Sequence, residues 1–403
     1  MAALHFGTTL STEERAEKQR LIVRDAIALL SLFAITAVLF TLTLLLFRSF
    51  SQHRQKLGER WRMRGETALN SGHPENAIEA LRSALAYAPS NRGLQIELAE
   101  ALAASGRTQE ALAYFNTLLE SEPGNGMINL QLARLAARQG STNVALEHYE
   151  SAMDGTWQGD GYVRRREVRL EMARYLIGLK RYDEARSQLL VAAGNAPDDV
   201  AVKLQIADLL EQAQYPADAL VLYRGMLTRH HVRLAALQGA ARTAFELGRF
   251  IEARSYLERA ITNPDFAKEA ESSRDANREM LADCTRILEL YPLPSLRVKE
   301  RATRISYNAK TAFARLTSCL AQNNTSAPLQ GLATQWQQTP ATSTINALER
   351  DPQLEQTMMQ LVYETEKVTS QSCGAPTGDD ALLLKIAQAP DLVAAGPGML
   401  GPQ

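Results

Sequence analysis

The residues in this 403-residue chain that are best suited to metal or redox chemistry are three cysteines and six histidines. Thiolate and imidazole groups bind zinc when they recur at short regular spacings, such as C-x-x-C. No such pair occurs, and we expect the adjacent His230 and His231 in a surface loop where both rings cannot readily face one metal. The sequence therefore predicts no metal site and no cofactor.

Motifs that carry catalytic chemistry are also missing. The chain has no GxxxxGK[ST] phosphate loop, no HExxH, no GxSxG, and no GxGxxG after a strand. Asp154 and Asp160 lack the D-x-D-x-D-G spacing of a calcium loop, so a plain loop is expected there. We predict no enzyme activity and no small-molecule substrate.

The balance of positive and negative charges limits the kinds of partner that the chain is expected to bind. Lys and Arg number 44 and Asp and Glu 45, which gives a formal net charge of -1. A nucleic-acid binder would usually be strongly basic, so no nucleic-acid partner is expected. Aromatic residues make up only 6%. This composition favours helices that pack through small residues.

The cysteines, Cys284, Cys319 and Cys373, all lie in the last third of the chain. Cys319 and Cys373 can form a disulfide if this region is exported, or stay as two buried thiols in a reducing compartment. Cys284 is left over in either case.

An uncharged apolar stretch near the N-terminus sets the membrane prediction. Residues 26–47 span about 33 Å as a helix, which matches a hydrocarbon core of about 30 Å. The residues after it offer no A-x-A cleavage site, so an uncleaved single-pass membrane helix is expected rather than a signal peptide. Residues 1–25 form a polar tail, and residues 48–57 are predicted to be a short polar linker.

Two cues for membrane orientation oppose each other. Basic residues are more numerous after the span than before it, which favours a cytoplasmic C-terminal side. A short N-terminal tail followed by one early span most simply inserts as a signal anchor and exports the rest, so we expect the chain after the span to be exported. The basic residues before the span are Arg15, Lys18, Arg20 and Arg24, and those after it are Arg48, Arg54, Lys56, Arg60, Arg62 and Arg64.

A repeated sequence element follows the apolar stretch and first appears at Trp61–Pro89. A small residue, a second small residue and a large residue recur six times in one register, with a period of about 34 residues. The first small residues are Gly65, Ala99, Ala133, Ala173, Ala207 and Ala241. The second small residues are Ala77, Ala111, Ala145, Ala185, Ala219 and Ala253. The large residues are Leu81, Phe115, Tyr149, Leu189, Tyr223 and Leu257.

On these landmarks the chain resembles the tetratricopeptide repeat (TPR) family over residues 58–265. The resemblance implies an all-α fold, with an α-solenoid of about six helix pairs after the membrane helix and a helical C-terminal region behind it. Glycine ends the first helix of four units, whereas Lys180 and Gln214 replace it in two others. An insertion near Asp154–Arg166 is expected to form a loop between units three and four.

Family members usually bind peptides or helices in a groove lined by the first helix of each repeat. In this register four successive units place an aliphatic residue in the groove, flanked by charges. An apolar binding groove and ordinary packing between repeats explain this row equally well. We predict that it binds a helix or extended segment of another protein. The candidate binding residues are Arg62, Ile96, Leu130, Arg134, Leu170, Arg174, Leu204 and Arg242.

Residues 266–390 resemble no enzyme family that we can name. Helices are expected over Asp265–Leu290, Ser295–Gln322, Asp351–Ser370 and Asp380–Ala387, an irregular stretch over Asn323–Thr344, and a flexible tail over residues 391–403. The first of these helices would cap the array.

The whole chain resembles bacterial single-span TPR proteins that assist assembly or quality control of envelope or secretion complexes. This resemblance implies a membrane-anchored scaffold, which we expect on the periplasmic side of a bacterial inner membrane. Two alternatives stay open: a structural subunit of a larger membrane complex, or an array that presents substrates to a ligand-binding or enzymatic domain in residues 266–390.

Overall fold

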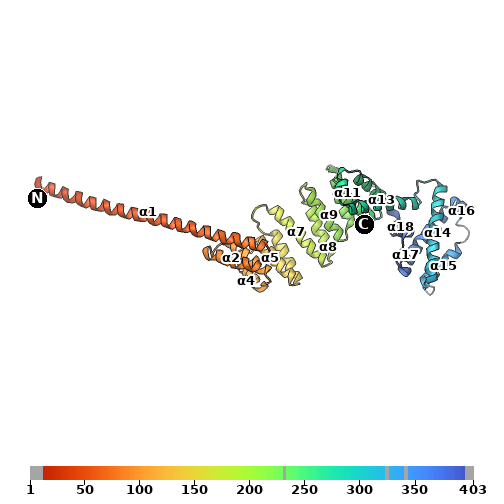
Figure 1. Ribbon diagram of the computed structural model, residues 1–403, viewed down its shortest axis with the longest axis horizontal. Coiled ribbons are helices and arrows are strands. Elements are labelled where there is room, and N and C mark those ends of the chain that lie inside the picture. Colours follow the sequence, from red (N-terminus) through yellow and green to blue (C-terminus); the bar gives the residue numbers. More distant parts are fainter. Residues whose placement is uncertain (1–11, 230–232, 323–325, 340–343, 395–403) are drawn as a thin grey trace, which may run out of the picture. The chain divides into compact units, whose positions relative to one another are not determined.

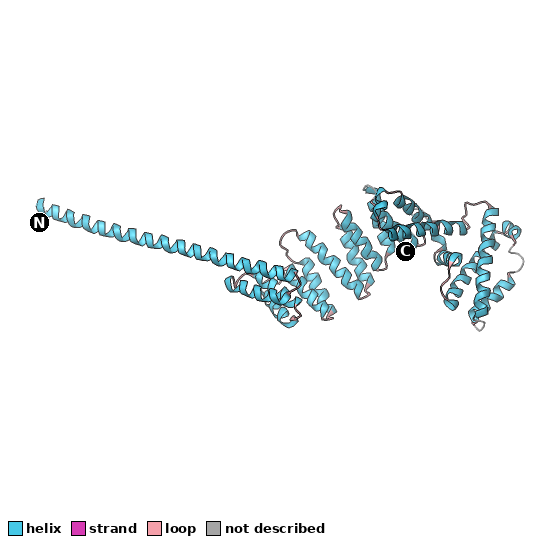
Figure 2. Ribbon diagram, viewed as in Figure 1, coloured by secondary structure: helices cyan, strands magenta, loops and turns pink. Residues whose placement is uncertain are grey.

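The computed structural model describes residues 12–229, 233–322, 326–339 and 344–394, which form helices joined by turns and short loops, with no strand among them (Figures 1 and 2). The chain divides into two compact units, residues 1–161 and 162–403. The first unit contains α1 (Thr12–Asn70), α2 (Pro74–Tyr87), α3 (Arg92–Ala104), α4 (Thr108–Ser121), α5 (Gly126–Arg138) and α6 (Thr142–Asp154).

The second unit holds the remaining helix pairs and the C-terminal helices. The pairs are α7 (Gly161–Gly178), α8 (Tyr182–Gly194), α9 (Val200–Gln212), α10 (Pro216–Arg229), α11 (Leu234–Glu246) and α12 (Phe250–Ile261). After them come η1 (Pro264–Lys268), α13 (Glu271–Leu290), α14 (Val298–Gln322), α15 (Ala327–Gln338), α16 (Ile345–Arg350), α17 (Pro352–Cys373), α18 (Gly378–Gln388) and η3 (Pro390–Leu392).

Helix α1 is much longer than the sequence predicted. It runs from Thr12 to Asn70, so the segment predicted as a linker, residues 48–57, is helical and continuous with the helix on either side (Figure 1). The reason is local, because no glycine or proline interrupts residues 48–57 and glutamine, arginine, lysine and leucine all favour helices. The final turns of α1 are therefore also the first helix of the first repeat.

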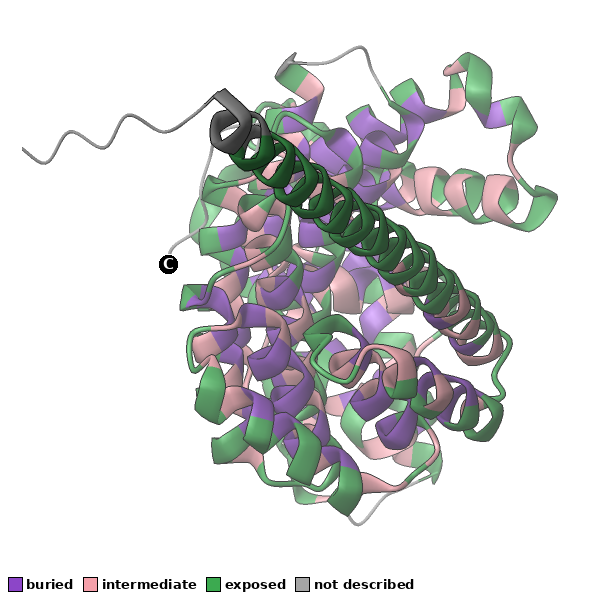
Figure 3. Ribbon diagram, turned by 90° about the vertical axis from the view of Figure 1, so that its left-hand side faces the viewer, coloured by how far each residue is buried: buried purple, intermediate pink, exposed green. Residues whose placement is uncertain are grey.

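The apolar part of α1 is a candidate membrane span. An 18-residue window of this helix has a mean hydropathy of 2.5, and none of that window is buried against the rest of the chain (Figure 3). Among the described residues it is the one helix long and apolar enough to cross a bilayer.

The six repeats have the register that the sequence predicted. The small residue of each second helix, from Ala77 to Ala253, is 0% exposed. The large residue four positions later fills the space beside the first helix, and a Cβ added to Gly65 would lie only 2.7 Å from Cγ of Leu81. Small residues thus allow the two helices of a pair to approach closely, and the large ones fill the remaining volume.

Each pair is closed by a turn residue with positive φ, including the two that are not glycine. Lys180 has φ 60° and Gln214 has φ 66°, beside 83° at Gly106. In these turns the next N–H donates to a carbonyl five residues back, as from Arg181 to Leu176 at 2.9 Å. This Schellman arrangement needs a left-handed residue, so the fold imposes the conformation even where the sequence offers no glycine.

The predicted insertion forms a short loop between α6 and α7 that packs back onto the first unit. Thr156 pairs with Asn125 in an isolated parallel bridge, and the Trp157 indole N–H donates to the Ala152 carbonyl at 2.9 Å. The Trp157 ring lies over Gly126, where a Cβ would be 2.3 Å from the ring. The loop is shorter than the predicted range, because α7 begins at Gly161 and its first turns contain Arg164–Arg166.

The C-terminal region differs from prediction at three points. The stretch predicted as irregular contains α15, because Leu329, Leu332 and Trp336 recur at helical spacing and pack on α14 and α17. The cap after the last repeat is η1 followed by α13, not one helix. The predicted flexible tail begins with an ordered segment in which Val393 is 0% exposed, whereas residues 395–403 lie outside the described part of the chain.

Candidate functional site

The first helices of the repeats contact one another directly within each unit, α1 with α3 and α3 with α5, and α9 with α11. We call the surface formed by these first helices the inner face. In the first unit it is bridged by the Arg62 guanidinium on α1. This group lies 2.7 Å from Glu59, 3.4 Å from Glu66 and 3.3 Å from Glu97 on α3. One arginine therefore ties the first two repeats together across their shared face.

The carboxylates on α3 are partly withdrawn from water. Burial raises the pKa of Glu97 and of Glu100 above the ordinary glutamate value, against the lowering effect of neighbouring arginines. The Gln131 amide on α5 donates to Glu100 at 2.5 Å, which extends the polar chain to the third repeat. The inner face of the first unit is thus a polar ladder rather than an apolar stripe.

The inner face of the second unit has a similar network built around a buried tyrosine. The Tyr223 hydroxyl donates to Asp208 at 2.9 Å, and Arg242 lies 2.8 Å from Glu211. Tyr223 reaches this face because position 239 is glycine: a Cβ there would lie 2.4 Å from the tyrosine ring. Burial and the nearby carboxylates raise the pKa of Tyr223, so the hydroxyl stays a donor.

The predicted aliphatic stripe is not an exposed groove. Leu130 is 6% exposed and Leu170 is 4% exposed, while Ile96 and Leu204 are half-buried. The prediction of an apolar binding surface is therefore wrong for Leu130 and Leu170, because their side chains turn into the packing between helices. A repeat period fixes which positions are equivalent. It leaves uncertain, by about one residue, which side chains of a helix point toward the surface.

The predicted basic residues lie on the inner face in different environments. Arg62 and Arg242 sit in the ion-pair networks described above, and Arg174 is exposed on α7. Arg134 acts on Glu100 electrostatically. The sequence alone did not identify Glu97 as a partner of Arg62, or Glu211 as a partner of Arg242. Glu97 directly follows the candidate binding residue Ile96, so extending the repeat register by one position would have found it.

Groups that could ligate a metal are dispersed. Among the described residues no three His, Cys, Asp or Glu side chains lie close enough to hold a metal ion. His148 instead contacts the Asn129 amide oxygen at 3.1 Å, and burial lowers its pKa. The pair His230 and His231 lies outside the described residues.

The structure joins Cys319 on α14 to Cys373 at the end of α17 as a disulfide, with their Cα atoms 5.9 Å apart. It sits in a small apolar cluster with Leu316, Leu329 and Leu361. Cys284 on α13 is a free thiol, fully buried, and burial raises its pKa to about 12. A thiol of that kind is unreactive at neutral pH.

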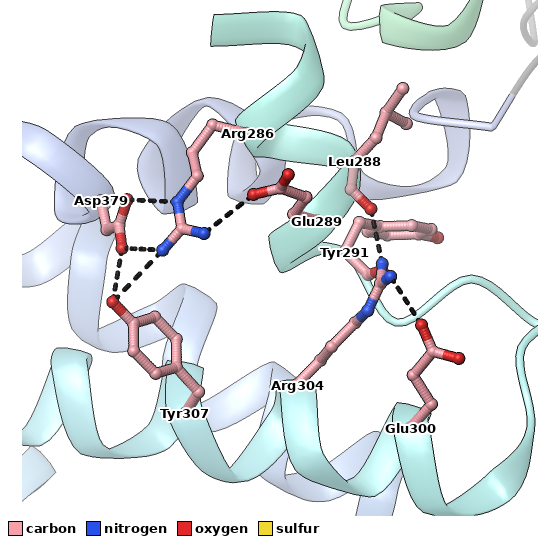
Figure 4. A network of polar contacts seen from close by, with 8 residues as sticks. All are labelled: Arg286, Leu288, Glu289, Tyr291, Glu300, Arg304, Tyr307 and Asp379. Carbon is pink, nitrogen blue, oxygen red and sulfur yellow. Dashed lines mark hydrogen bonds and ion pairs between the residues drawn. The ribbon is translucent and has the colours of Figure 1, made fainter. Parts of the chain in front are cut away.

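Polar contacts clamp the C-terminal helices to α13 (Figure 4). Arg286 donates to both oxygens of Asp379 on α18, at 2.9 and 2.7 Å, and the Tyr307 hydroxyl on α14 donates to the same carboxylate at 2.6 Å. These donors lower the pKa of Asp379. Arg304 donates to the carbonyls of Leu288 and Tyr291, which caps the C-terminal end of α13 (Figure 4).

Comparison with known proteins finds one matching family model, described as tetratricopeptide repeat, over residues 62–126 and 96–160. No curated protein sequence matches the chain. These matched ranges cover the first three repeats, in the register that the small and large residues define.

Solved structures of repeat proteins are similar to this chain only distantly. The structure titled "Functional Characterization of Pseudomonas Aeruginosa pilF" is 18% identical, with a TM-score of 0.38, and covers 56% of this chain and 99% of its own. PilW, whose title calls it a widely conserved type IV pilus biogenesis factor, is 14% identical with a TM-score of 0.38, and covers 54% and 97%. A tetratricopeptide repeat protein from Parabacteroides merdae is 15% identical with a TM-score of 0.35, and covers 83% and 99%.

The likeness to tetratricopeptide repeats rests on the matching family model together with the repeat geometry, and not on these distant similarities. Six helix pairs share the small and large packing residues and the left-handed turn. Residues 62–160 of the chain match the tetratricopeptide repeat family model.

Proposed function

We propose that this protein is a membrane-anchored scaffold whose inner face binds a helix or extended segment of another protein. The tetratricopeptide fold is a protein-interaction scaffold, and the arrays stack helices into an elongated binding surface. The observation that carries the proposal is the continuity of α1, which contains the candidate span and also the first helix of the first repeat. Anchoring would confine the repeats to the bilayer surface and raise the effective concentration of any partner held there.

The inner face would recognise its partner mainly through polar groups. Its arginines and carboxylates are already held in place by contacts between repeats, such as Arg62 with Glu97 and Arg242 with Glu211. Groups fixed before binding lose little side-chain freedom when a partner arrives, so they favour specificity. We propose assembly or quality control of a bacterial envelope or secretion complex as the setting, without enzyme activity of its own.

Photo-crosslinking in membranes tests this proposal. A photoreactive amino acid is placed at Arg174, which is exposed on α7, the first helix of the fourth repeat, and in a matched control at Val221, which is 50% exposed on α10, the second helix of the fifth repeat. We expect a crosslinked partner of one defined size from position 174 and none from position 221. Equal adducts from both positions, or adducts only from 221, would reject binding on the inner face.

A further inference from the structure

Three helices of the C-terminal region meet at a pair of carboxyl groups, one fully buried and one half-buried. Glu366 on α17 is 0% exposed, and Asp380 from the first turn of α18 interacts with it. The only guanidinium facing the pair among the described residues is that of Arg315 on α14, whose Nε lies 3.6 Å from Glu366 Oε2. Neither oxygen of Glu366, nor Oδ1 of Asp380, has a hydrogen-bond donor.

The positive charge available to this pair is already shared. Arg315 also donates to the Thr369 hydroxyl at 2.9 Å and to the Gly374 carbonyl at 2.8 Å. The other nearby charges are Asp379, one residue before Asp380, and Arg286 on α13, which bind each other (Figure 4). Two ionised carboxylates beside one guanidinium would therefore leave a buried excess of negative charge.

A single proton relieves that excess. Burial and mutual repulsion raise the pKa of Glu366, and burial raises the pKa of Asp380. Once one carboxyl is protonated, it gains a donor that the other can accept, which satisfies two oxygens that otherwise lack partners. Among the described residues no three acidic, histidine or cysteine side chains here lie close enough to hold a metal ion, and Asp379 is bound by Arg286, so a proton fits the site better than a metal ion does.

The pair lies at one end of a helix that also touches the last repeat. From α18, the Lys385 ammonium lies 4.7 Å from the centre of the Phe245 ring on α11. Just beyond α18, Ala389 packs against Gly248, and the Ile251 N–H donates to the Val393 carbonyl at 3.3 Å. Helix α18 therefore connects α14 and α17 to the end of the repeat array.

We propose that Glu366 and Asp380 form a proton-dependent clasp that holds α18 in place between α17 and the last repeat. With one shared proton the clasp is closed. Loss of that proton leaves two anions, one of them fully buried, facing one arginine, and the N-terminal turn of α18 separates from α17. Since the closed form binds one more proton than the open form, opening increases as the pH rises, by up to about tenfold per pH unit above the pKa of the pair.

Hydrogen exchange of the oxidised full chain in detergent tests the clasp. Amide exchange over residues 378–388 is measured between pH 6.5 and 9.5 for the natural protein and for Glu366→Gln, and the ratio of the two rates removes the intrinsic effect of pH. The glutamine matches the protonated glutamate in shape, so its α18 should stay protected. We expect the ratio to rise at least tenfold across this range.

The matched control is Glu364→Gln, an exposed glutamate on the same helix. It should behave like the natural protein at every pH. Asp380→Asn provides a second variant, whose α18 should also lose the pH dependence, so a folding failure of one variant does not decide the outcome. A rate ratio that stays at one, or an equal effect of Glu364→Gln, would overturn the clasp.

Discussion

At the scale of single residues, the two turns without glycine carry a measurable strain. Lys180 and Gln214 hold positive φ angles of 60° and 66°. A left-handed conformation costs a residue with a Cβ about 1 kcal/mol relative to glycine. We therefore expect Lys180→Gly and Gln214→Gly each to raise the free energy of unfolding by about 0.5–1 kcal/mol, measured by chemical denaturation.

The matched control for this prediction is Gly106→Ala. Gly106 has a φ of 83° and no neighbour within 4 Å of an added Cβ, so only backbone strain is introduced. It should lower stability by a similar amount. If Gly106→Ala is neutral, the turn conformation is not what distinguishes these positions.

A second residue-scale prediction separates packing from surface chemistry on the first helices. Leu130→Glu places a charge at a 6% exposed position and should cost about 3–5 kcal/mol of stability. Arg174→Glu changes an exposed side chain and should shift stability by less than about 0.5 kcal/mol. Thermal unfolding of both variants checks the contrast, and similar melting temperatures would contradict the burial of Leu130.

The residues of the polar ladder could be predicted from sequence only in part. The register selected Arg62 and Arg242 as candidates on first helices, because the repeat period fixes which positions are equivalent. It could not predict that Arg62 pairs with Glu97, since that contact depends on the rotation of one helix against the next. Glu366 and Asp380 had no sequence signal, because a turn of the chain, not a repeat, brings them together.

At the scale of elements, the disulfide holds the ends of α14 and α17 together across the segment that contains α15 and α16. Its sequence separation is 54 residues, and closing a loop of that length stabilises a fold by about 4 kcal/mol in the chain-entropy account. We expect Cys319→Ser to lower the unfolding free energy of the C-terminal region by about 2–4 kcal/mol. Cys284 is a free thiol, so Cys284→Ser removes no crosslink and should not lower stability by this mechanism.

Comparing oxidised and reduced natural protein checks this prediction. Reduction should cause the same loss of stability as Cys319→Ser, and should have no further effect on that variant. A loss on reduction that persists in Cys319→Ser would assign the effect to something other than this disulfide.

Element boundaries show what a composition-based prediction misses. Residues 48–57 were expected to be a linker because they are polar, yet they lack any helix-breaking residue between two helical stretches. Helix α15 was expected to be irregular because it is rich in Gln and Thr, yet Leu329, Leu332 and Trp336 give it one apolar face. A polar composition indicates that a segment is exposed, whereas helix-breaking residues and the spacing of apolar residues decide whether it is helical.

At the scale of the whole molecule, sidedness of the membrane decides which partners are available. We propose that the repeats lie on the periplasmic side, and expect external protease to remove a C-terminal tag from spheroplasts before lysis. The Cys319–Cys373 disulfide is consistent with that side, since disulfides persist in oxidising compartments. Protection until lysis would instead agree with the greater number of basic residues after the span.

The helix from the candidate span to the first repeat is unbroken, so the number of residues in it sets the direction in which the first repeats face. Each residue of an α-helix adds about 100° of rotation and 1.5 Å of rise. Two residues inserted after Gln52 would turn the first repeats by about 200° relative to the span, whereas seven would return them to within about 20° while lifting them further. If a partner also sits in the membrane, complex formation should depend on the phase of the insertion rather than on its length.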